Sequence, residues 1–245
     1  MKQRPAGRVR TLRALAATAA LAALALIGFL VLAAGAKAAT PADAGTAGDP
    51  APREWAFRVL LDGKPIGTHR FSVATRGDER TVASDAAFDV KVMFVTAYRY
   101  RHHAAERWRG GCLVSLAART EAGGSIDVVT AGDADAAGLA IVGPQGAQRL
   151  AGCVSTYAYW DPALPQRTQL LNPQTGRLEA VKFDPPVAGS IDVRGVATAA
   201  RRIRLTGPEQ PIDLWYAPSG AWIGLDSTVA GGRKLTYRLV AAGTP

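Results

Sequence analysis

The feature that most constrains the fold of this chain is a two-residue alternation of large apolar side chains with other residues. From Trp55 to Leu61 every second residue is large and apolar, the spacing that turns one face of a β-strand toward a core. The turn sequence DGKPIG follows, and Phe71 and Val73 continue the alternation, which predicts a β-hairpin. Residues typical of turns separate further stretches of the same kind, so the chain is predicted to be mainly β.

Most of the predicted strands are long and closely spaced. They cover residues 82–94, 97–109, 112–120, 125–130, 139–142, 177–183, 190–194, 196–206, 212–217, 221–229 and 234–240. Long antiparallel strands joined by short turns favour arrangements that protect their edges. We therefore expect a large curved antiparallel sheet or a half-open barrel in meander order. Pro162, Pro165 and Pro173 argue against regular strands in residues 151–176, where a short helix or an ordered loop is expected.

The N-terminal segment has the pattern of a signal peptide. The first thirteen residues contain five Lys or Arg and no acid, and residues 14–36 are apolar or glycine except for Thr18. Small residues at Ala36 and Ala38 predict cleavage after Ala38 and export to the periplasm. The apolar run is also long enough to span a bilayer. Retention as an inner-membrane anchor, with membrane contact through this segment alone, is therefore the alternative.

The remaining chain is predicted to be a short tether followed by one domain. Residues 39–53 contain no large apolar side chain and are predicted to be flexible. Residues 54–240 then form a single β domain of ordinary size. Residues 1–38 hold six Lys or Arg and no acid, so the formal net charge of +9 falls to +3 without them. Such a small charge gives no reason to expect a nucleic-acid partner.

The chain contains two cysteines, Cys112 and Cys153. In an exported protein such a pair is predicted to form a disulfide. Two separately buried thiols are the alternative. Because the spacing is unlike Cys-x-x-Cys, the cysteines do not predict a redox or metal site.

The segment AYRYRHHAAERWRG carries most of the candidate ligand-binding residues. If it is a strand, Tyr98, Tyr100, His102, Glu106 and Trp108 share one face, and four arginines lie on the other. The aromatic face is typical of a cavity wall, with ordinary half-buried packing as the alternative. The arginine row is predicted either to pair with acids on the next strand or to contact anionic head groups.

Two further tryptophans are candidates for the same cavity. Trp160 ends the aromatic run of STYAYWDP, and Trp215 lies in IDLWY. Each is predicted either to line the cavity or to fill the core. The sequence NPQTG, residues 172–176, predicts a turn whose tip could carry binding residues.

The sequence offers little support for catalysis, a metal or a cofactor. In a strand, His102 and Glu106 lie roughly 13 Å apart along the axis, too far to bind one ion directly. The chain has no Gly-x-Ser-x-Gly elbow and no phosphate-binding glycine loop. No cofactor and no metal are therefore predicted. His69 could join His102 or Glu106 as an acid–base group, so an enzymatic function stays an alternative.

Five blocks, in order, resemble those of a family of exported proteobacterial proteins that carries a domain-of-unknown-function label. The blocks are LDGKPIGTHRF, AYRYRHHAAERWRGGCL, STYAYWDP, LLNPQTG and IDLWY. The resemblance covers about residues 54–240 and implies a periplasmic, mostly β domain with no established activity. No catalytic residue is carried over. The tryptophan-led start and the glycine turns also resemble periplasmic half-barrels that hold acyl chains, such as lipoprotein carriers, an analogy of architecture.

These patterns favour a non-enzymatic binding or carrier domain for an amphipathic or lipid-like ligand. A hydrolase-type enzyme acting on an envelope component is one alternative. The other is a partner-binding envelope protein whose interface is the arginine-rich strand face.

Overall fold

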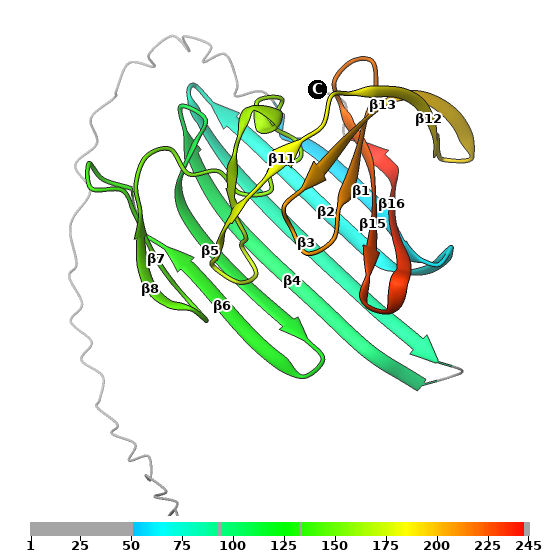
Figure 1. Ribbon diagram of the computed structural model, residues 1–245, viewed down its shortest axis with the longest axis horizontal. Coiled ribbons are helices and arrows are strands. Elements are labelled where there is room, and N and C mark those ends of the chain that lie inside the picture. The colour runs from blue at the N-terminus through cyan, green and yellow to red at the C-terminus, as the bar shows by residue number, and fades with distance from the viewer. Residues whose placement is uncertain (1–50, 93–94, 133, 243–245) are drawn as a thin grey trace, which may run out of the picture. The chain divides into compact units, whose positions relative to one another are not determined.

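The computed structural model describes residues 51–92, 95–132 and 134–242 (Figure 1). The predicted signal peptide, residues 1–38, lies outside these ranges, as do all but the last three residues of the predicted tether. Strand β1 begins at Arg53, one residue before the predicted start of the domain.

Strands make up most of the described chain, and the prediction of a mainly β protein is confirmed. The strands are β1 (Arg53–Leu61), β2 (Lys64–Arg76), β3 (Glu79–Val92), β4 (Val95–Arg109), β5 (Cys112–Ala122), β6 (Ser125–Ala131), β7 (Leu139–Gly143), β8 (Gly146–Leu150), β9 (Gln169–Leu171), β10 (Leu178–Ala180), β11 (Lys182–Phe183), β12 (Val187–Val193), β13 (Val196–Thr206), β14 (Ile212–Tyr216), β15 (Trp222–Val229) and β16 (Arg233–Ala242). Two short 3₁₀ turns, η1 (Leu164–Gln166) and η2 (Ala230–Gly232), accompany them.

Fourteen of the described strands form one large antiparallel sheet that contains two meanders joined side by side, and β9 and β10 form a separate pair. Strands β1 to β8 follow one another across the sheet, and β13 to β16 do the same. Strand β16 pairs with β1, so the end of the domain continues the sheet beside its first strand. The path ends at β8 and β11, which are not paired with each other, so the sheet is not closed. The expected curved, half-open meander is therefore confirmed.

The proline-containing region departs in part from the expectation. It holds the short helical turn η1, as expected, but also strand β9, which pairs with β10. Pro173 lies in the turn between these two strands, where it removes no ladder hydrogen bond. The single strand predicted over residues 177–183 is divided into β10 and β11, because β10 pairs with β9 whereas β11 pairs with β13 of the large sheet.

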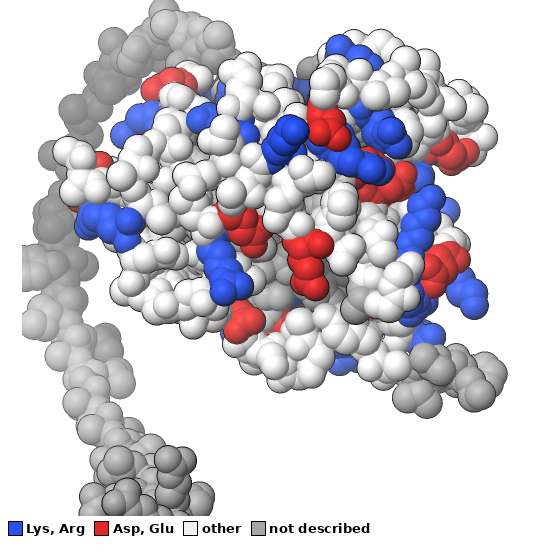
Figure 2. All heavy atoms as spheres, in the orientation of Figure 1, with Lys and Arg blue, Asp and Glu red and all other residues white. Residues whose placement is uncertain are grey.

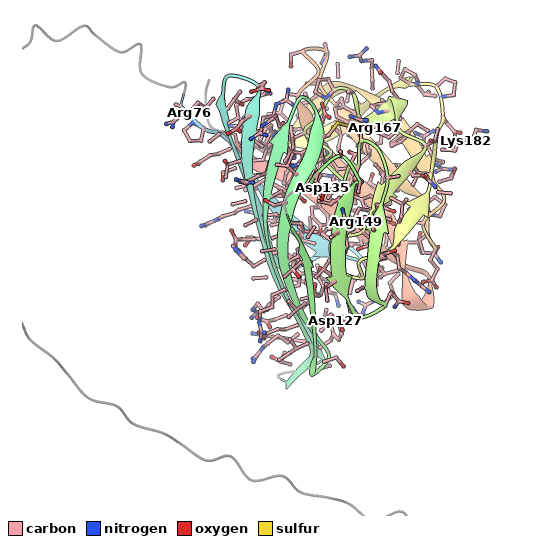
Figure 3. All side chains as sticks on the ribbon, turned by 90° about the vertical axis from the view of Figure 1, so that its left-hand side faces the viewer. Arg76, Asp127, Asp135, Arg149, Arg167 and Lys182 are labelled. Carbon is pink, nitrogen blue, oxygen red and sulfur yellow. A yellow bond between two sulfur atoms is a disulfide. The ribbon has the colours of Figure 1, made fainter. Side chains whose placement is uncertain are left out.

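Side-chain alternation sorts the long strands into an inner, apolar face and an outer, charged face. The largest fully buried side chains include Phe57, Trp108, Leu113, Leu214 and Trp222. Figure 1 shows strands β13–β16 turning toward β2–β5. In the side view of Figure 3, side chains fill the space between the two layers of strands. The core therefore lies on the concave side of the sheet.

Residues 153–180, here called the inner segment, lie against this concave side. The predicted disulfide between Cys112 and Cys153 is present and joins the start of β5 to the inner segment. Leu113 N donates to Val154 O at 2.8 Å, and Arg167 Nη2 donates to Gly111 O at 2.8 Å. Figure 3 places Arg167 between the two layers of strands. The inner segment is thus fastened to one end of β5.

Candidate functional site

Strand β4 presents two chemically different faces, as its alternation predicts. His102, Glu106 and Trp108 are buried on the inner face, and Tyr100 is half-buried there. Tyr98 belongs to the same face but is 43% exposed, since it lies near the end of the strand beside a turn glycine.

The inner face of β4 forms part of an open cavity of about 1120 Å³. Strands β2, β3 and β4 form one wall. The other lining residues come from the inner segment, from Gln145 and Gln148, from residues 207–210 and Ile212, and from strands β15 and β16. The aromatic lining residues lie on β2, β4, the inner segment, β15 and β16: Phe71, Tyr100, Tyr157, Tyr159, Trp160, Trp222 and Tyr237. These rings offer a large apolar contact area beside the polar side chains of the same cavity.

Two histidines line the cavity, and burial keeps both of them neutral. His69 Nε2 lies 2.8 Å from Ser84 Oγ, and His102 Nδ1 lies 2.9 Å from Thr120 Oγ1. Burial, with a smaller contribution from the charge of His102, lowers the pKa of His69 to about 3. Burial, followed by repulsion from His103, lowers the pKa of His102 to about 4. The Nδ1 atom of His69 is buried without a hydrogen-bond partner.

Glu106 is the most deeply placed acid of the cavity wall, only 8% exposed. The indole Nε1 of Trp108 donates to Glu106 Oε2 at 2.8 Å, and the Thr156 hydroxyl also donates to the carboxylate. Burial outweighs both hydrogen bonds and raises the pKa of Glu106 to about 7. The carboxyl group is therefore close to half-protonated at neutral pH.

A second acid, Glu179, organises the rim formed by the inner segment. The Tyr157 hydroxyl donates to Glu179, and Asn172 Nδ2 donates to Glu179 Oε1 at 3.0 Å. Burial and this carboxylate raise the pKa of Tyr157 well above its usual value. Gln174 N donates to Asn172 Oδ1 at 2.9 Å, which fixes the turn predicted from NPQTG. The turn residues line the cavity mouth.

The structure brings some of the predicted site residues together and separates others. Tyr100, His102, Glu106 and Trp160 line the cavity. Trp108 is fully buried behind it, with its ring edge-to-face against Trp160 at 5.5 Å.

Tyr98 and Trp215 are not cavity-lining residues. Trp215 alternates with Leu214 and Tyr216, both of which are buried, and its ring lies next to Gly189 of β12. Its Nε1 donates to Asp226 Oδ2 at 3.0 Å. Of the two expectations for Trp215, the structure fits packing against the core, because β12 lies on its side of the strand.

Several lining residues were not singled out from the sequence. Ser84, Glu179, Leu235 and Tyr237 reach the cavity from three different elements. The two-residue alternation of β16 predicts that Tyr237 faces inward, but it does not show that Tyr237 lines a cavity. Glu179 lies in a short strand with no pattern that separates it from a surface acid.

The arginine row on the outer face of β4 is paired with acids. Arg99 and Arg101 both bond to Asp89, at 3.3 and 2.9 Å. Arg109 bonds to Glu79 across the same pair of strands. Figure 2 shows positive and negative side chains interspersed on the face that it draws. The expected pairing with acids on the next strand is confirmed.

Neither a metal site nor a membrane-spanning helix is found in the part of the chain that the structure describes. No group of three or more His, Cys, Asp or Glu in residues 51–92, 95–132 and 134–242 could hold a metal ion. Within the same ranges, no helix is long and apolar enough to cross a bilayer.

Comparisons with known proteins identify the family and the fold. Residues 57–240 match a family described as a domain of unknown function, DUF6134. No curated protein matches the sequence. Among solved structures, the chain is similar to a β-barrel-like protein of the domain of unknown function DUF1849 from Brucella abortus. The identity is 11%, the TM-score is 0.57, and the match covers 78% of this chain and 96% of that one. This likeness shows the fold alone.

Proposed function

This chain belongs to the DUF6134 family, a domain of unknown function, and we propose that it is a non-enzymatic binding or carrier domain for an amphipathic or lipid-like ligand. The residues of its cavity support this proposal. The observation that carries the proposal is the open, aromatic-lined cavity of about 1120 Å³ on the concave side of the sheet. Small-molecule pockets usually occupy roughly 300–1,000 Å³, so a ligand with a long apolar part would fit.

The lining matches a molecule with one apolar part and one polar part. Half-buried aromatic rings from different parts of the lining, such as Tyr100 of β4 and Tyr157 of the inner segment, provide apolar contact area. Polar groups also line the cavity, among them Glu106 and the unpaired Nδ1 of His69, and they can orient a head group. A lining that combines aromatic rings with polar side chains suits an amphiphile, whose apolar and polar parts can each make contacts.

The polar groups favour binding over hydrolysis. Ser84 and His69 are hydrogen-bonded to each other, as a nucleophile and its general base would be. However, a histidine with a pKa of about 3 accepts a proton poorly at neutral pH. The other ring nitrogen of His69 has no acid to orient it. His102 and Glu106 bond to different partners, Thr120 and Trp108.

We propose further that the domain works in the periplasm. The signal-peptide pattern of residues 1–38 supports this location. The Cys112–Cys153 disulfide is compatible with an oxidising compartment. An inner-membrane anchor formed by an uncleaved leader would leave the domain on the same side of the membrane.

Gentle purification followed by native mass spectrometry and lipid extraction tests the proposal. We expect the mature wild-type protein to carry a bound amphiphile. Ala104 and Ala105 provide a matched pair of variants, because Ala104 lines the cavity and Ala105 is exposed on the other face of β4. Ala104→Phe should displace the ligand, whereas Ala105→Phe should retain it.

Circular dichroism and thermal melting show whether both variants are folded. Equal ligand content in folded Ala104→Phe and Ala105→Phe proteins would contradict binding in this cavity. An empty wild-type protein that also fails to bind added amphiphiles of several head-group types would reject the carrier function itself.

A further inference from the structure

Glu106 is a buried acid with no cationic partner among the described residues. Its hydrogen-bond donors, Trp108 Nε1 and the Thr156 hydroxyl, are neutral. Among the described residues no Lys or Arg forms an ion pair with Glu106, whereas Asp89, Glu79 and Glu121 on the outer face of the sheet are bonded to arginines. An ionised carboxylate that is removed from water is stable only when a positive charge or strong donors compensate it.

The surroundings of Glu106 favour a positive charge. Three acids, Glu106, Glu179 and Glu209, line the cavity, against a single Lys or Arg, Arg177, among its described lining residues. His69 and His102 are neutral because burial lowers both pKa values. The lining therefore carries a net negative charge whenever Glu106 is ionised.

Aromatic side chains of the inner segment add to this preference. Tyr157, Tyr159 and Trp160 follow Thr156, whose hydroxyl bonds to Glu106, and all three line the cavity. The guanidinium group of Arg80 already lies over the Trp160 ring, 5.6 Å from its centroid, so rings of this wall do attract a cation. Tyr100 lies roughly 20 Å from Glu106 along β4 and can contact only the hydrocarbon part of a ligand bound there. The faces of aromatic rings attract cations, with Trp and Tyr the strongest. A carboxylate together with several aromatic rings is the combination that binds ammonium groups.

We propose that the ligand of this cavity is a cationic amphiphile, whose ammonium head group pairs with Glu106 while its hydrocarbon part lies along the aromatic lining. This inference rests on the proposed binding function and names the class of ligand. An anionic amphiphile would bring a second negative charge toward Glu106, and an uncharged one would leave the ionised carboxylate without a counter-charge. The ammonium group neutralises a charge that the described residues leave uncompensated.

Three probes with the same twelve-carbon chain test the inference: dodecyltrimethylammonium, dodecyl maltoside and dodecyl sulfate. Binding to the mature protein at pH 8, below the micelle concentration of each probe, is measured by calorimetry and tryptophan fluorescence. We expect the ammonium probe to bind at least about tenfold more tightly than the sulfate, a difference of about 1.4 kcal/mol.

Two variants separate the head-group contact from the rest of the site. Glu106→Gln keeps the shape of the side chain and should weaken binding of the ammonium probe by about tenfold. The same variant should change maltoside binding by less than about threefold, since the tail contacts remain. Glu121→Gln, whose side chain pairs with Arg119 on the outer face, should leave binding of both probes unchanged.

The possible outcomes distinguish this inference from the proposed function. Equal affinities for the ammonium and sulfate probes, or a folded Glu106→Gln protein with unaltered ammonium binding, would overturn the inference and leave the carrier function standing. Absence of binding by all three probes would overturn both. If Glu106→Gln does not fold, the ranking of the probes on the wild-type protein decides the question alone.

Discussion

The indole of Trp108 donates a 2.8 Å hydrogen bond to the carboxyl group of Glu106, two residues earlier on the same face of β4. Trp108 is 1% exposed and does not touch the cavity. A tryptophan that the sequence suggested as a ligand contact therefore acts as the support of an acid that does line the cavity. Because the bond is strongest to the ionised carboxylate, it links core packing to the charge of the site.

Trp108→Phe keeps an aromatic ring in the core but removes the indole donor. We expect the free energy of unfolding to fall by on the order of 1–3 kcal/mol, the usual cost of leaving a buried polar group without its partner. The loss should be larger at pH 8 than at pH 6, because more of Glu106 is ionised at the higher pH. Urea unfolding at both pH values measures this difference.

Trp215→Phe is the matched control for this substitution. It removes an indole donor to Asp226 at a position away from the cavity. An equal pH dependence in the two variants would show that Glu106 is not the origin of the effect.

Acid should destabilise the domain through its buried histidines. The pKa of His102 is lowered from 6.5 to about 4, so the folded state binds protons less readily than the unfolded state. The stability that the neutral ring provides is present above pH 6.5 and is lost as the pH falls toward 4. At pH 5 the loss from His102 is on the order of 2 kcal/mol.

His102→Asn tests this assignment while keeping a polar group near Thr120. Between pH 7.5 and pH 5, the variant should lose less stability than the wild type in chemical unfolding. His103→Asn serves as the control, because His103 is the next residue of β4 and its side chain lies on the exposed outer face. If both variants follow the wild-type curve, another group is responsible for the acid sensitivity.

The disulfide should stabilise both the domain and its cavity. It closes a loop with a sequence separation of 41 residues, which corresponds to about 4 kcal/mol in the chain-entropy model. Replacing Cys112 and Cys153 together by Ser should therefore lower the thermal midpoint clearly. Affinity for a twelve-carbon probe should fall as well, because the inner segment that carries Tyr157 and Trp160 loses its anchor. A double variant with unchanged melting and unchanged affinity would contradict this role.

The strands could be predicted because the sequence patterns that define a strand involve only neighbouring residues. Alternation along β1 and β4 and glycines at the turns depend only on neighbouring residues. The pairing of Trp55 with Ala242 joins the two ends of the domain, and no pattern among neighbouring residues predicts this pairing. The same holds for the position of the inner segment, which depends on one disulfide and a few backbone hydrogen bonds formed across the sheet.

The candidate site was predictable only in part for the same reason. Alternation correctly placed Tyr100, His102 and Glu106 on one face of β4. In β14, alternation could not show whether Trp215 or its neighbours Leu214 and Tyr216 face inward, because all three side chains are large and apolar or aromatic. Packing of β12 against Trp215 settles that choice, and it involves residues far along the chain.

Binding of the ammonium probe should strengthen as the pH rises from 6 to 8. Burial raises the pKa of Glu106 to about 7, so the carboxyl group is mostly neutral at pH 6 and mostly ionised at pH 8. If only the ionised form pairs with the ammonium group, the apparent affinity should increase about tenfold over this interval.

The other titratable and charged groups of the cavity should contribute little to this pH dependence. His69 on β2 and His102 on β4 stay neutral throughout, since their pKa values are lowered to about 3 and 4. The pKa of Tyr157 on the inner segment is raised, so its hydroxyl keeps its proton and its bond to Glu179. Arg177 remains cationic across the interval. Binding curves at pH 6, 7 and 8 should be steep for the wild type and flat for Glu106→Gln. A flat wild-type profile, or the same slope in the variant, would show that Glu106 is not the group that meets the ligand's charge.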